Sequence, residues 1–160
     1  MVKITLISVG KIKEKYIKLG IEEFSKRLTK YCKLEIIEVV DEKAPENLSE
    51  KEISIVKDKE GEKIFSNIKQ NSFIISLAID GKKYSSMNFA KELDKITISG
   101  NSHIYFIIGG SLGLSDKILN TSNLKISFSD MTFPHQLMRL FLLEQIYRAF
   151  KINNGEPYHK

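Results

Sequence analysis

The stretch His103-Ile-Tyr-Phe-Ile-Ile-Gly-Gly-Ser-Leu-Gly113 passes from an apolar, strand-like segment directly into a turn that holds three glycines. A short helix is expected after it, from about Ser115 to Asn120, and a strand followed by a turn and a helix is typical of a parallel sheet. Glycines at such a turn let a ligand approach the backbone, and ligands of open parallel sheets bind beyond the carboxyl ends of the strands. The turn therefore predicts a pocket for a nucleotide-like ligand.

Strand-like and helix-like segments alternate along the rest of the chain. The expected strands cover residues 2–9, 34–40, 73–79, 103–108 and 124–128. A helix is expected to begin at Ser49, because Glu52 completes a capping box, and to end near Lys69. The Asp80-Gly81 pair is expected to close the third strand as a turn. The alternation predicts an α/β fold, a mainly parallel sheet with helices on both faces, in a single domain over residues 1–160.

The last helix is expected to start at Pro134, which suits a first helical turn, and to reach about Ile152. Its apolar residues cover most of the circumference and include Leu137, Leu140, Phe141, Leu142, Leu143, Ile146, Tyr147 and Phe150. A helix that is apolar nearly all round is buried on more than one side. A second copy of the chain can supply the second side, which predicts a homodimer. The alternative is a central helix packed within one monomer.

Composition bounds the class of protein. A length of 160 residues fits one domain with a real core, and the apolar runs are too short to cross a bilayer. The N-terminal sequence enters a strand directly and lacks the cleavage site of a secretory signal, which predicts a cytoplasmic protein. Cys32 is the only cysteine, so an internal disulfide and a multi-cysteine zinc site are excluded. The net charge of +5 attracts phosphate-rich partners but by itself favours nucleic-acid binding only slightly.

The glycine-rich turn leaves a dinucleotide-binding interpretation open. A G-x-G-x-x-G fingerprint that ends on Gly110 and Gly113 needs glycine at position 108, where Ile108 stands. Asp130, just past the next strand, lies roughly where the ribose-binding acid belongs. However, the fingerprint normally follows the first strand of its fold rather than the fourth. An NAD-dependent Rossmann-type oxidoreductase is therefore the second hypothesis for this chain.

The C-terminal third carries several longer motifs. They are Phe106-Ile-Ile-Gly-Gly-Ser-Leu-Gly-Leu114, Ser127-Phe-Ser-Asp-Met-Thr-Phe-Pro-His-Gln-Leu-Met-Arg139, Leu142-Leu-Glu-Gln-Ile-Tyr-Arg-Ala-Phe150 and Pro157-Tyr-His-Lys160. Earlier in the chain stand Ile7-Ser-Val-Gly-Lys-Ile-Lys-Glu-Lys-Tyr16 and the polar loop segment Asp41-Glu-Lys-Ala-Pro-Glu-Asn47. In this order, and over essentially the whole chain, these segments resemble the ribosomal RNA large subunit methyltransferase H family of the SPOUT superfamily.

The resemblance implies a fold and a reaction that composition and periodicity alone do not predict. The fold is an α/β domain whose C-terminal part is threaded into a deep trefoil knot, a feature rare enough that sequence reasoning alone would discard it. The implied enzyme is a homodimer that uses S-adenosylmethionine to methylate N3 of a pseudouridine in 23S ribosomal RNA. The implied substrate is the assembled 70S ribosome, and neither a membrane nor a metal ion takes part.

The resemblance also assigns residues to a cofactor site. It places Leu77, on the third strand, and Gly109, at the end of the fourth, in the wall of the cofactor pocket. The loop that wraps the cofactor consists of Phe128, Ser129, Asp130, Met131, Thr132 and Phe133. The chemistry of this loop fits that role, because its aromatic and thioether side chains offer apolar surface to an adenine ring while its backbone can read the edge of the ring.

Three residues near the C-terminus are the candidates for catalysis. N3 of pseudouridine is a poor nucleophile until it loses its proton, so a base or an anion-stabilising group is needed. The resemblance assigns Tyr158 and His159 to an acceptor-binding tail that completes the site of the other chain, with His159 as a base or a positioning group. It also assigns Arg148, which can hold a phosphate or the deprotonated base. The alternative for Arg148 is a salt bridge with Glu144, one helical turn earlier.

Overall fold

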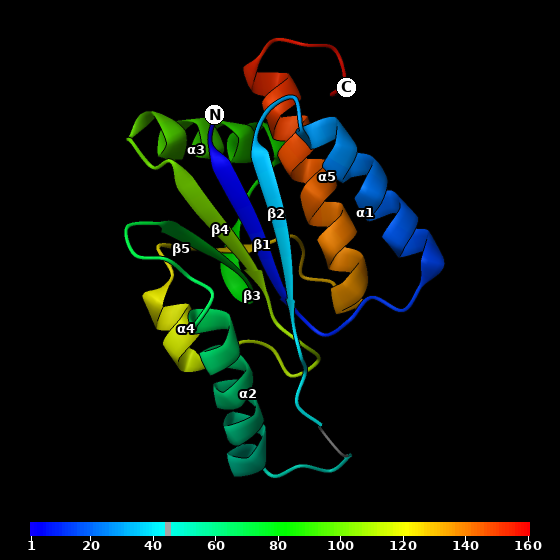
Figure 1. Cartoon of the computed structure of the whole chain (residues 1–160), viewed down its shortest axis with the longest axis vertical. Helices are drawn as coiled ribbons and strands as arrows, with labels where there is room; N and C mark the ends of the chain where they lie inside the picture. Colours follow the sequence, from blue (N-terminus) through cyan, green and yellow to red (C-terminus); the bar gives the residue numbers. More distant parts are fainter. Residues whose placement is uncertain (44–45) are drawn as a thin grey trace.

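In the described residues of the computed structural model, 1–43 and 46–160, five parallel strands form one sheet in the order β2-β1-β4-β3-β5 (Figure 1). The strands are β1 (Lys3–Val9), β2 (Lys33–Val39), β3 (Phe73–Lys83), β4 (His103–Ile108) and β5 (Leu124–Ser127). The predicted strands are all present, and the prediction of a parallel sheet is confirmed. Pro45 of the predicted polar loop lies outside the described residues.

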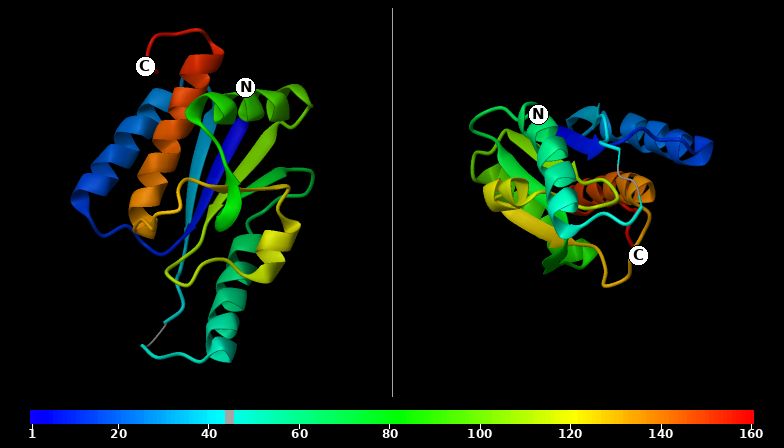
Figure 2. Two further views of the ribbon diagram at one scale, coloured as in Figure 1. Left: turned by 180° about the vertical axis from the view of Figure 1, so that it is seen from behind. Right: turned by 90° about the horizontal axis from the view of Figure 1, so that it is seen from below.

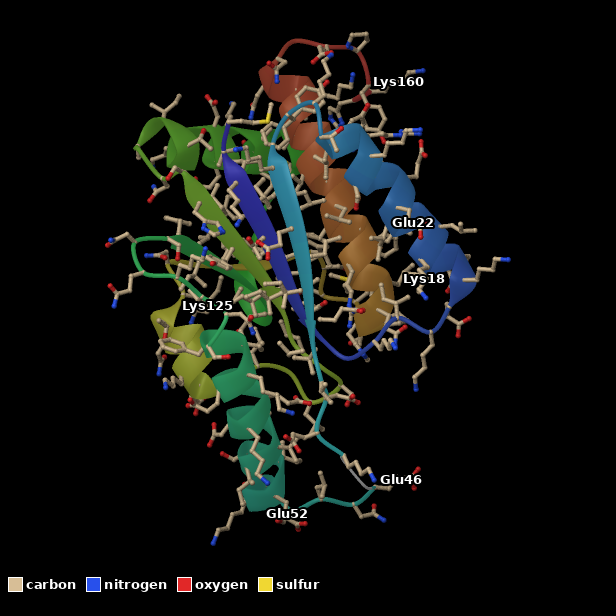
Figure 3. All side chains as sticks on the ribbon, viewed as in Figure 1. Lys18, Glu22, Glu46, Glu52, Lys125 and Lys160 are labelled. Carbon is tan, nitrogen blue, oxygen red and sulfur yellow. The ribbon has the colours of Figure 1, made fainter. Side chains whose placement is uncertain are left out.

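Helices cover both faces of the sheet, as predicted (Figure 2). One face carries α1 (Lys15–Leu28), α3 (Ser86–Ile98) and α5 (His135–Asn153), and the other carries α2 (Glu50–Phe65) and α4 (Asp116–Thr121). Side chains of a strand alternate between the two faces, so Leu6 and Ile7 pack into different apolar clusters. Charged side chains such as Lys18 and Glu22 of α1 point away from the sheet (Figure 3). Across the part of the chain that the structure describes, no helix is long and apolar enough to cross a membrane.

Helix α2 begins as predicted but ends earlier. The capping box forms at Ser49, whose hydroxyl accepts from the amide of Glu52 while its own amide donates to the Glu52 carboxylate. The helix ends at Phe65 rather than near Lys69. The side chain of Asn67 donates to a carbonyl of the last helical turn, which competes with continuation of the helix.

Two glycines allow close approaches between elements. A Cβ atom on Gly61 of α2 would lie 2.5 Å from Oγ of Ser115, so glycine at this position lets α2 pack against the start of α4. A Cβ atom on Gly81 would lie 2.6 Å from the backbone carbonyl carbon of Ile126 in β5. In both places a larger residue would push two backbone segments apart.

The Asp80-Gly81 pair does not end β3, so the predicted turn is wrong. Strand β3 continues to Lys83 and pairs with β5 on both sides of a bulge, because Leu77 and Lys82 both lie opposite Ile126. Hydrogen bonding to the neighbouring strand overrides the local turn preference of the Asp-Gly pair. The bulge leaves residues 77–79 beside the cavity described below.

Helix α5 is buried from several sides within one chain. It packs against α1 and α3 and against the sheet, and its fully buried side chains include Leu142, Leu143, Ile146 and Ala149. Packing within the monomer therefore buries four of the eight apolar residues named from the sequence, and the other four stay partly exposed. Phe141, on the remaining side, stays partly exposed. The homodimer stays a prediction.

The buried guanidinium of Arg139 fastens the start of α5 to the sheet. Arg139 is 1% exposed, and its Nη2 atom donates to the carbonyls of Val9 (2.7 Å) and Gly10 (3.0 Å) at the end of β1. Its Nη1 atom forms an ion pair with Glu38 of β2 at 2.8 Å. Burial lowers the pKa of Arg139, and the Glu38 carboxylate opposes that shift. These bonds position the first turns of α5 above the strand ends.

Candidate functional site

Two adjoining cavities lie beyond the ends of β4 and β5. The larger has a volume of about 450 Å³ and is lined by the eight residues predicted to hold a cofactor, namely Leu77, Gly109 and residues 128–133. The glycine turn 109–113 forms one wall, and residues 77–79 at the β3 bulge form another. The structure thus brings together three segments that are far apart in the sequence.

The glycine turn lines the larger cavity with three glycines, which carry no side chain, and with Ser111 and Leu112. Gly110 and Gly113 pair across the turn as an isolated antiparallel bridge, and Gly113 has a φ of +90°, which favours glycine. A Cβ atom on Gly109 would lie 2.8 Å from the carbonyl carbon of Gly113. A ligand can therefore reach the peptide groups of this wall and hydrogen-bond to them.

The lining of the larger cavity is mainly apolar and nearly free of charge. Ile79 and Met131 line it although 86% and 75% of their surfaces are exposed, so a ligand that covers them would bury apolar area. Among the described lining residues there is no lysine or arginine, and Asp130, the one carboxylate, forms an ion pair with Lys83. Burial lowers the pKa of His135, which favours its neutral form. This lining suits an aromatic ring and a cationic group, and it offers no basic side chain to a pyrophosphate.

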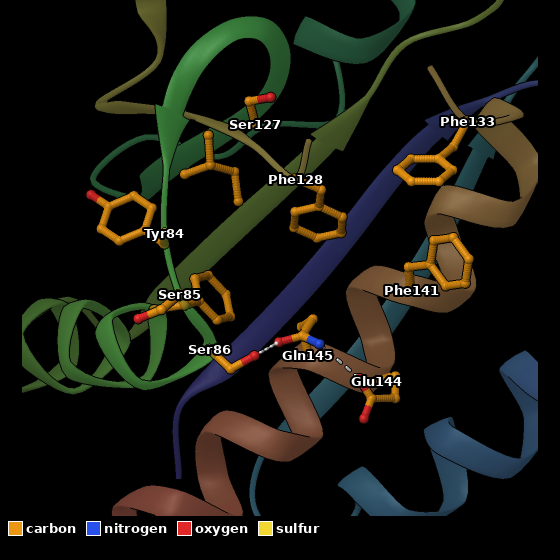
Figure 4. A pocket seen from close by; sticks show the side chains of 11 residues that line it. Tyr84, Ser85, Ser86, Ser127, Phe128, Phe133, Phe141, Glu144 and Gln145 are labelled. Atoms are coloured by element: carbon orange, nitrogen blue, oxygen red, sulfur yellow. Dashed lines mark hydrogen bonds between the residues drawn. The ribbon is translucent and has the colours of Figure 1, made fainter. Parts of the chain in front are cut away.

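The smaller cavity, whose lining side chains are drawn in Figure 4, has a volume of about 260 Å³. It shares a wall with the larger cavity. Four residues line both cavities: Ile126, Ser127, Phe128 and Phe133. Further aromatic side chains come from Tyr84, Phe89 and Phe141. The rings of Phe133 and Phe141 meet edge to face, with centroids 5.6 Å apart. A ligand in the smaller cavity would therefore lie between aromatic surfaces and next to whatever the larger cavity holds.

A fixed amide faces the smaller cavity. The Ser86 hydroxyl donates to Oε1 of Gln145 at 2.8 Å, and Nε2 of Gln145 donates to Oε2 of Glu144 at 3.0 Å (Figure 4). A carboxylate only accepts hydrogen bonds, so Glu144 determines which end of the amide is the NH₂ group. Gln145 is thus held in one orientation by two partners.

The three predicted catalytic residues meet at the C-terminal half of α5. Nε and Nη2 of Arg148 donate to Oε1 of Glu144 at 3.0 and 2.6 Å, so the salt bridge weighed as the alternative role of Arg148 is present. The Tyr158 hydroxyl donates to the same oxygen at 3.1 Å, and the Arg148 guanidinium lies 4.8 Å from the centroid of the Tyr158 ring. Nη1 of Arg148 lies 3.0 Å from Nδ1 of His159. We call these four residues the Glu144 cluster.

The contact with Arg148 fixes the hydrogen-bonding role of His159. A guanidinium carries donors only, so Nδ1 accepts and the proton of the neutral ring sits on Nε2. In this arrangement the imidazole offers a ligand an N–H donor and has no free lone pair. Burial raises the pKa of the Tyr158 hydroxyl, and Glu144 raises it further, so Tyr158 also stays a donor.

The C-terminal tail lies beside the cavities of its own chain rather than in them. Within the described residues, none of 157–160 lines either cavity. Glu144 connects the tail with the smaller cavity, because it lines that cavity and also binds Arg148 and Tyr158. Over residues 1–43 and 46–160, no three His, Cys, Asp or Glu side chains lie together as a metal-binding group.

Sequence reasoning missed two residues of this site. Gln145 stands inside the Leu142–Phe150 motif, but nothing in its spacing shows that it faces a cavity. Ser86 belongs to none of the motifs and lies 59 residues away from Gln145 in the chain. Glu144 is expected from the sequence only as a partner of Arg148, whereas it also holds Tyr158 and Gln145. Contacts between distant elements leave no local pattern by which sequence could find them.

The chain is a methyltransferase of the SPOUT class, and its parallel α/β sheet is consistent with that class. Residues 2–159 match the sequence model of a family described as predicted SPOUT methyltransferase, and the chain belongs to this family. The resemblance read from the sequence is thereby confirmed.

Bacterial proteins named Ribosomal RNA large subunit methyltransferase H are similar to the chain over almost their whole length. The one from Clostridioides difficile (strain 630) is 67% identical, over 98% of this chain and 99% of that protein. The one from Clostridium tetani (strain Massachusetts / E88) is 59% identical over the same shares. A solved structure described as a probable methylase family protein from Haemophilus influenzae Rd KW20 has a TM-score of 0.52 and 12% identity, over 99% of this chain and 70% of that chain. This last likeness concerns the fold alone.

The NAD-dependent oxidoreductase, the second hypothesis, is not supported. The family is one of methyltransferases, and the glycine turn follows β4 in a sheet whose order differs from the Rossmann order. Asp130, the candidate ribose-binding acid, has a side chain 83% exposed and is paired with Lys83. The position of Asp130 in the sequence was therefore not enough to predict a dinucleotide site, because the cavity beside it offers no basic side chain to a pyrophosphate.

Proposed function

We propose that the chain uses S-adenosylmethionine to methylate N3 of a pseudouridine in 23S ribosomal RNA, with the assembled 70S ribosome as its substrate. The observation that carries this proposal is that all eight predicted cofactor residues line the larger cavity. The Glu144 cluster lies next to the smaller cavity, which adjoins the larger one. The names of the relatives support a large-subunit ribosomal RNA, and a net charge of +5 suits a phosphate-rich partner. The named relatives are bacterial, and a ribosomal substrate agrees with the predicted cytoplasmic location.

The larger cavity fits S-adenosylmethionine by the chemistry of its lining. Phe128, Ile79 and Met131 offer apolar surface for the adenine, and the peptide groups of the glycine turn and of residues 128–133 can bond its polar edges. The described lining has no lysine or arginine that would repel a positively charged sulfonium. When bound, the cofactor supplies an electrophilic methyl group, so the transfer requires no metal.

The acceptor must lose the proton of N3 so that the nitrogen lone pair can form the new bond to carbon. The negative charge that develops spreads over the two carbonyl oxygens beside N3, and both oxygens accept hydrogen bonds. Arg148 and the Nε2–H of His159 are donors suited to hold that charge. His159 then positions and stabilises the base rather than removing the proton, which leaves to solvent. Tyr158 offers a ring for stacking on the base.

The active assembly in this proposal is a homodimer. In a single chain the tail lies beside the smaller cavity, and a second copy can bring its own tail over the larger one. Leu137 and Leu140 are partly exposed residues of α5 that line neither cavity, and they provide apolar surface for such a contact. In this arrangement each chain presents its Glu144 cluster as one hydrogen-bonded group, because Glu144 binds Arg148 and Tyr158 and Arg148 binds His159.

The trefoil knot belongs to the same proposal. Membership of the SPOUT family supports it, as does the path of the chain, since residues 128–134 lead from the edge strand β5 past the glycine turn of β4 to α5. Pulling the unfolded chain by its two ends tests the knot. A knotted chain remains shorter than its full contour length after it has unfolded, whereas an unknotted chain reaches that length.

Methylation of purified ribosomes tests the reaction. Ribosomes from cells that lack this protein are incubated with the enzyme and labelled S-adenosylmethionine, and the 23S RNA is digested and analysed by mass spectrometry. We expect one methyl group on N3 of one pseudouridine in 70S ribosomes and much less on naked 23S RNA. Label on a ribose or on another base, or none with intact ribosomes, would contradict the proposal.

A further inference from the structure

We propose that the smaller cavity holds the acceptor base and that the side chain of Gln145 selects pseudouridine over uridine. This inference rests on the proposed function and assigns its substrate selectivity to one residue. The cavity has a volume of about 260 Å³, below the roughly 300–1,000 Å³ typical of pockets for drug-sized ligands, which suits a single nucleobase. Its shared wall with the larger cavity places the base next to the methyl donor.

Aromatic side chains supply the stacking surface that an unpaired base needs. Tyr84, Phe128 and Phe141 line the smaller cavity, with Phe141 held edge to face against Phe133. Bases that are taken out of an RNA helix are commonly stacked on such rings, and this stacking is tolerant of sequence. The rings therefore account for binding of a base but not for a choice between bases.

Distinguishing one base from another requires polar groups, and the side-chain amide of Gln145 has hydrogen-bonding sites that no protein group occupies. Its Oε1 atom accepts from Ser86 and its Nε2 atom donates to Glu144. An amide oxygen has two lone pairs and an amide nitrogen has two protons. One acceptor site therefore remains on Oε1 and one donor site on Nε2, and both atoms are bonded to the same carbon. Because Gln145 lines the cavity, this pair of groups can face a ligand there.

Pseudouridine presents the complement of that pair. Its N1 atom carries a hydrogen, because the ribose is attached to C5, and the C2 carbonyl is next to N1. An N1–H to Oε1 bond and an Nε2–H to O2 bond would match the amide of Gln145. N3 lies on the far side of the C2 carbonyl and stays free to face the methyl donor. Uridine turned to fit the same place presents a C5–H group, which cannot replace the N1–H donor.

The orientation of the amide is essential to this selectivity. Glu144 can accept but not donate, so Nε2 must face it and Oε1 must face Ser86. If the amide were free to turn, its oxygen and nitrogen would exchange places and the match with N1–H would be lost. Ser86 and Glu144 are therefore positioning residues for Gln145.

The test compares the wild type with Gln145→Leu, which keeps the size and removes both polar groups. The matched control is Gln136→Leu on the same helix, because Gln136 bonds to Lys11 and Lys13 and lines neither cavity. Each protein is given two kinds of unmethylated 70S ribosomes, one with pseudouridine at the acceptor site and one with uridine there. The readout is the ratio of kcat/KM on the two substrates.

We expect the wild type and Gln136→Leu to prefer pseudouridine by about tenfold or more, which corresponds to a single hydrogen bond. Gln145→Leu should bring the ratio to about one by losing rate on pseudouridine while keeping its rate on uridine. An unchanged ratio in Gln145→Leu would overturn the inference. If the wild type methylates neither kind of ribosome, the proposed function fails instead.

A second measurement uses the wild-type dimer and does not depend on the folding of a variant. Side-chain amide signals of Gln145 and Gln136 are followed by NMR while free pseudouridine or uridine nucleoside is added in the presence of S-adenosylmethionine. Selective shifts of the Gln145 signals with pseudouridine would support the inference. Equal responses to both nucleosides, no response at Gln145, or a crystal structure with a side chain of the second subunit filling the cavity would overturn it.

Discussion

Nη1 of Arg148, on the last helix, lies 3.0 Å from Nδ1 of His159 in the C-terminal tail. This contact turns the imidazole into a donor through Nε2–H, because a guanidinium cannot accept a hydrogen bond. It also ties the tail to α5 through Glu144, the shared acceptor of Arg148 and Tyr158. A proton-abstracting histidine would need a free lone pair, which this arrangement does not leave.

The role of His159 can be tested with two substitutions. His159→Ala removes the Nε2–H donor and is expected to lower kcat by about 10²-fold, as for the loss of one anion-stabilising donor. His159→Gln keeps a terminal N–H group and should retain a clearly larger share of the activity. Single-turnover rates on 70S ribosomes across pH 6–9 measure both. Equal loss in the two variants, with loss of a rising limb of the pH profile, would identify His159 as a base.

Mixing two impaired variants, at an S-adenosylmethionine concentration too low to saturate Gly109→Ala, tests whether the tail acts on the partner subunit. His159→Ala damages the tail and Gly109→Ala damages the cofactor cavity. If each site combines one cavity with the other subunit's tail, a mixed dimer has one intact site, and equal mixing should restore about a quarter of wild-type activity. The mixture is unfolded and refolded together so that subunits exchange. Activity that stays at the level of the separate variants would indicate that each tail serves its own chain.

Two glycine substitutions separate the cofactor cavity from general packing. A Cβ on Gly109 would meet the backbone of Gly113 at 2.8 Å, so Gly109→Ala must distort the turn and is expected to weaken S-adenosylmethionine binding at least tenfold. A Cβ on Gly20 would meet only the end of the flexible Leu140 side chain, also at 2.8 Å. Gly20→Ala should therefore bind the cofactor normally. Calorimetric titration measures both, and equal affinities would argue against the assigned cavity.

Glu60 is expected to make the fold less stable as pH rises. It is 5% exposed, accepts a hydrogen bond from the amide of Glu42 at 3.0 Å, and has a pKa raised by burial. A raised pKa in the folded state means that ionisation is easier after unfolding, so stability falls as pH rises from below the ordinary glutamate pKa through the raised one. Glu60→Gln keeps the acceptor without the charge.

The variant should therefore melt at a higher temperature than the wild type at pH 7, and the two should melt together near pH 4. For a chain of this size, each kcal/mol of added stability raises the midpoint by roughly 2–4 °C. Melting curves followed by circular dichroism measure the difference at each pH. A difference that is the same at pH 4 and pH 7 would show that the charge of Glu60 is not its cause.

Local patterns along the chain were sufficient for the elements and for their class of fold. Strand His103–Ile108 and the capping box of α2 follow from periodicity and short-range hydrogen bonding, and the order of alternation implies a parallel sheet. Several short motifs, taken in order along essentially the whole chain, were sufficient to place it in its family. These features depend on residues that are close together in the sequence.

Other features were decided by contacts between distant segments. Asp80-Gly81 has the local preference of a turn, but pairing with β5 holds it inside a bulged strand. Gln145 meets Ser86 only because α3 and α5 pack side by side, and Arg139 is buried only because the ends of β1 and β2 offer it acceptors. Such contacts depend on the placement of whole elements, to which many packing interactions contribute, so no short pattern specifies them.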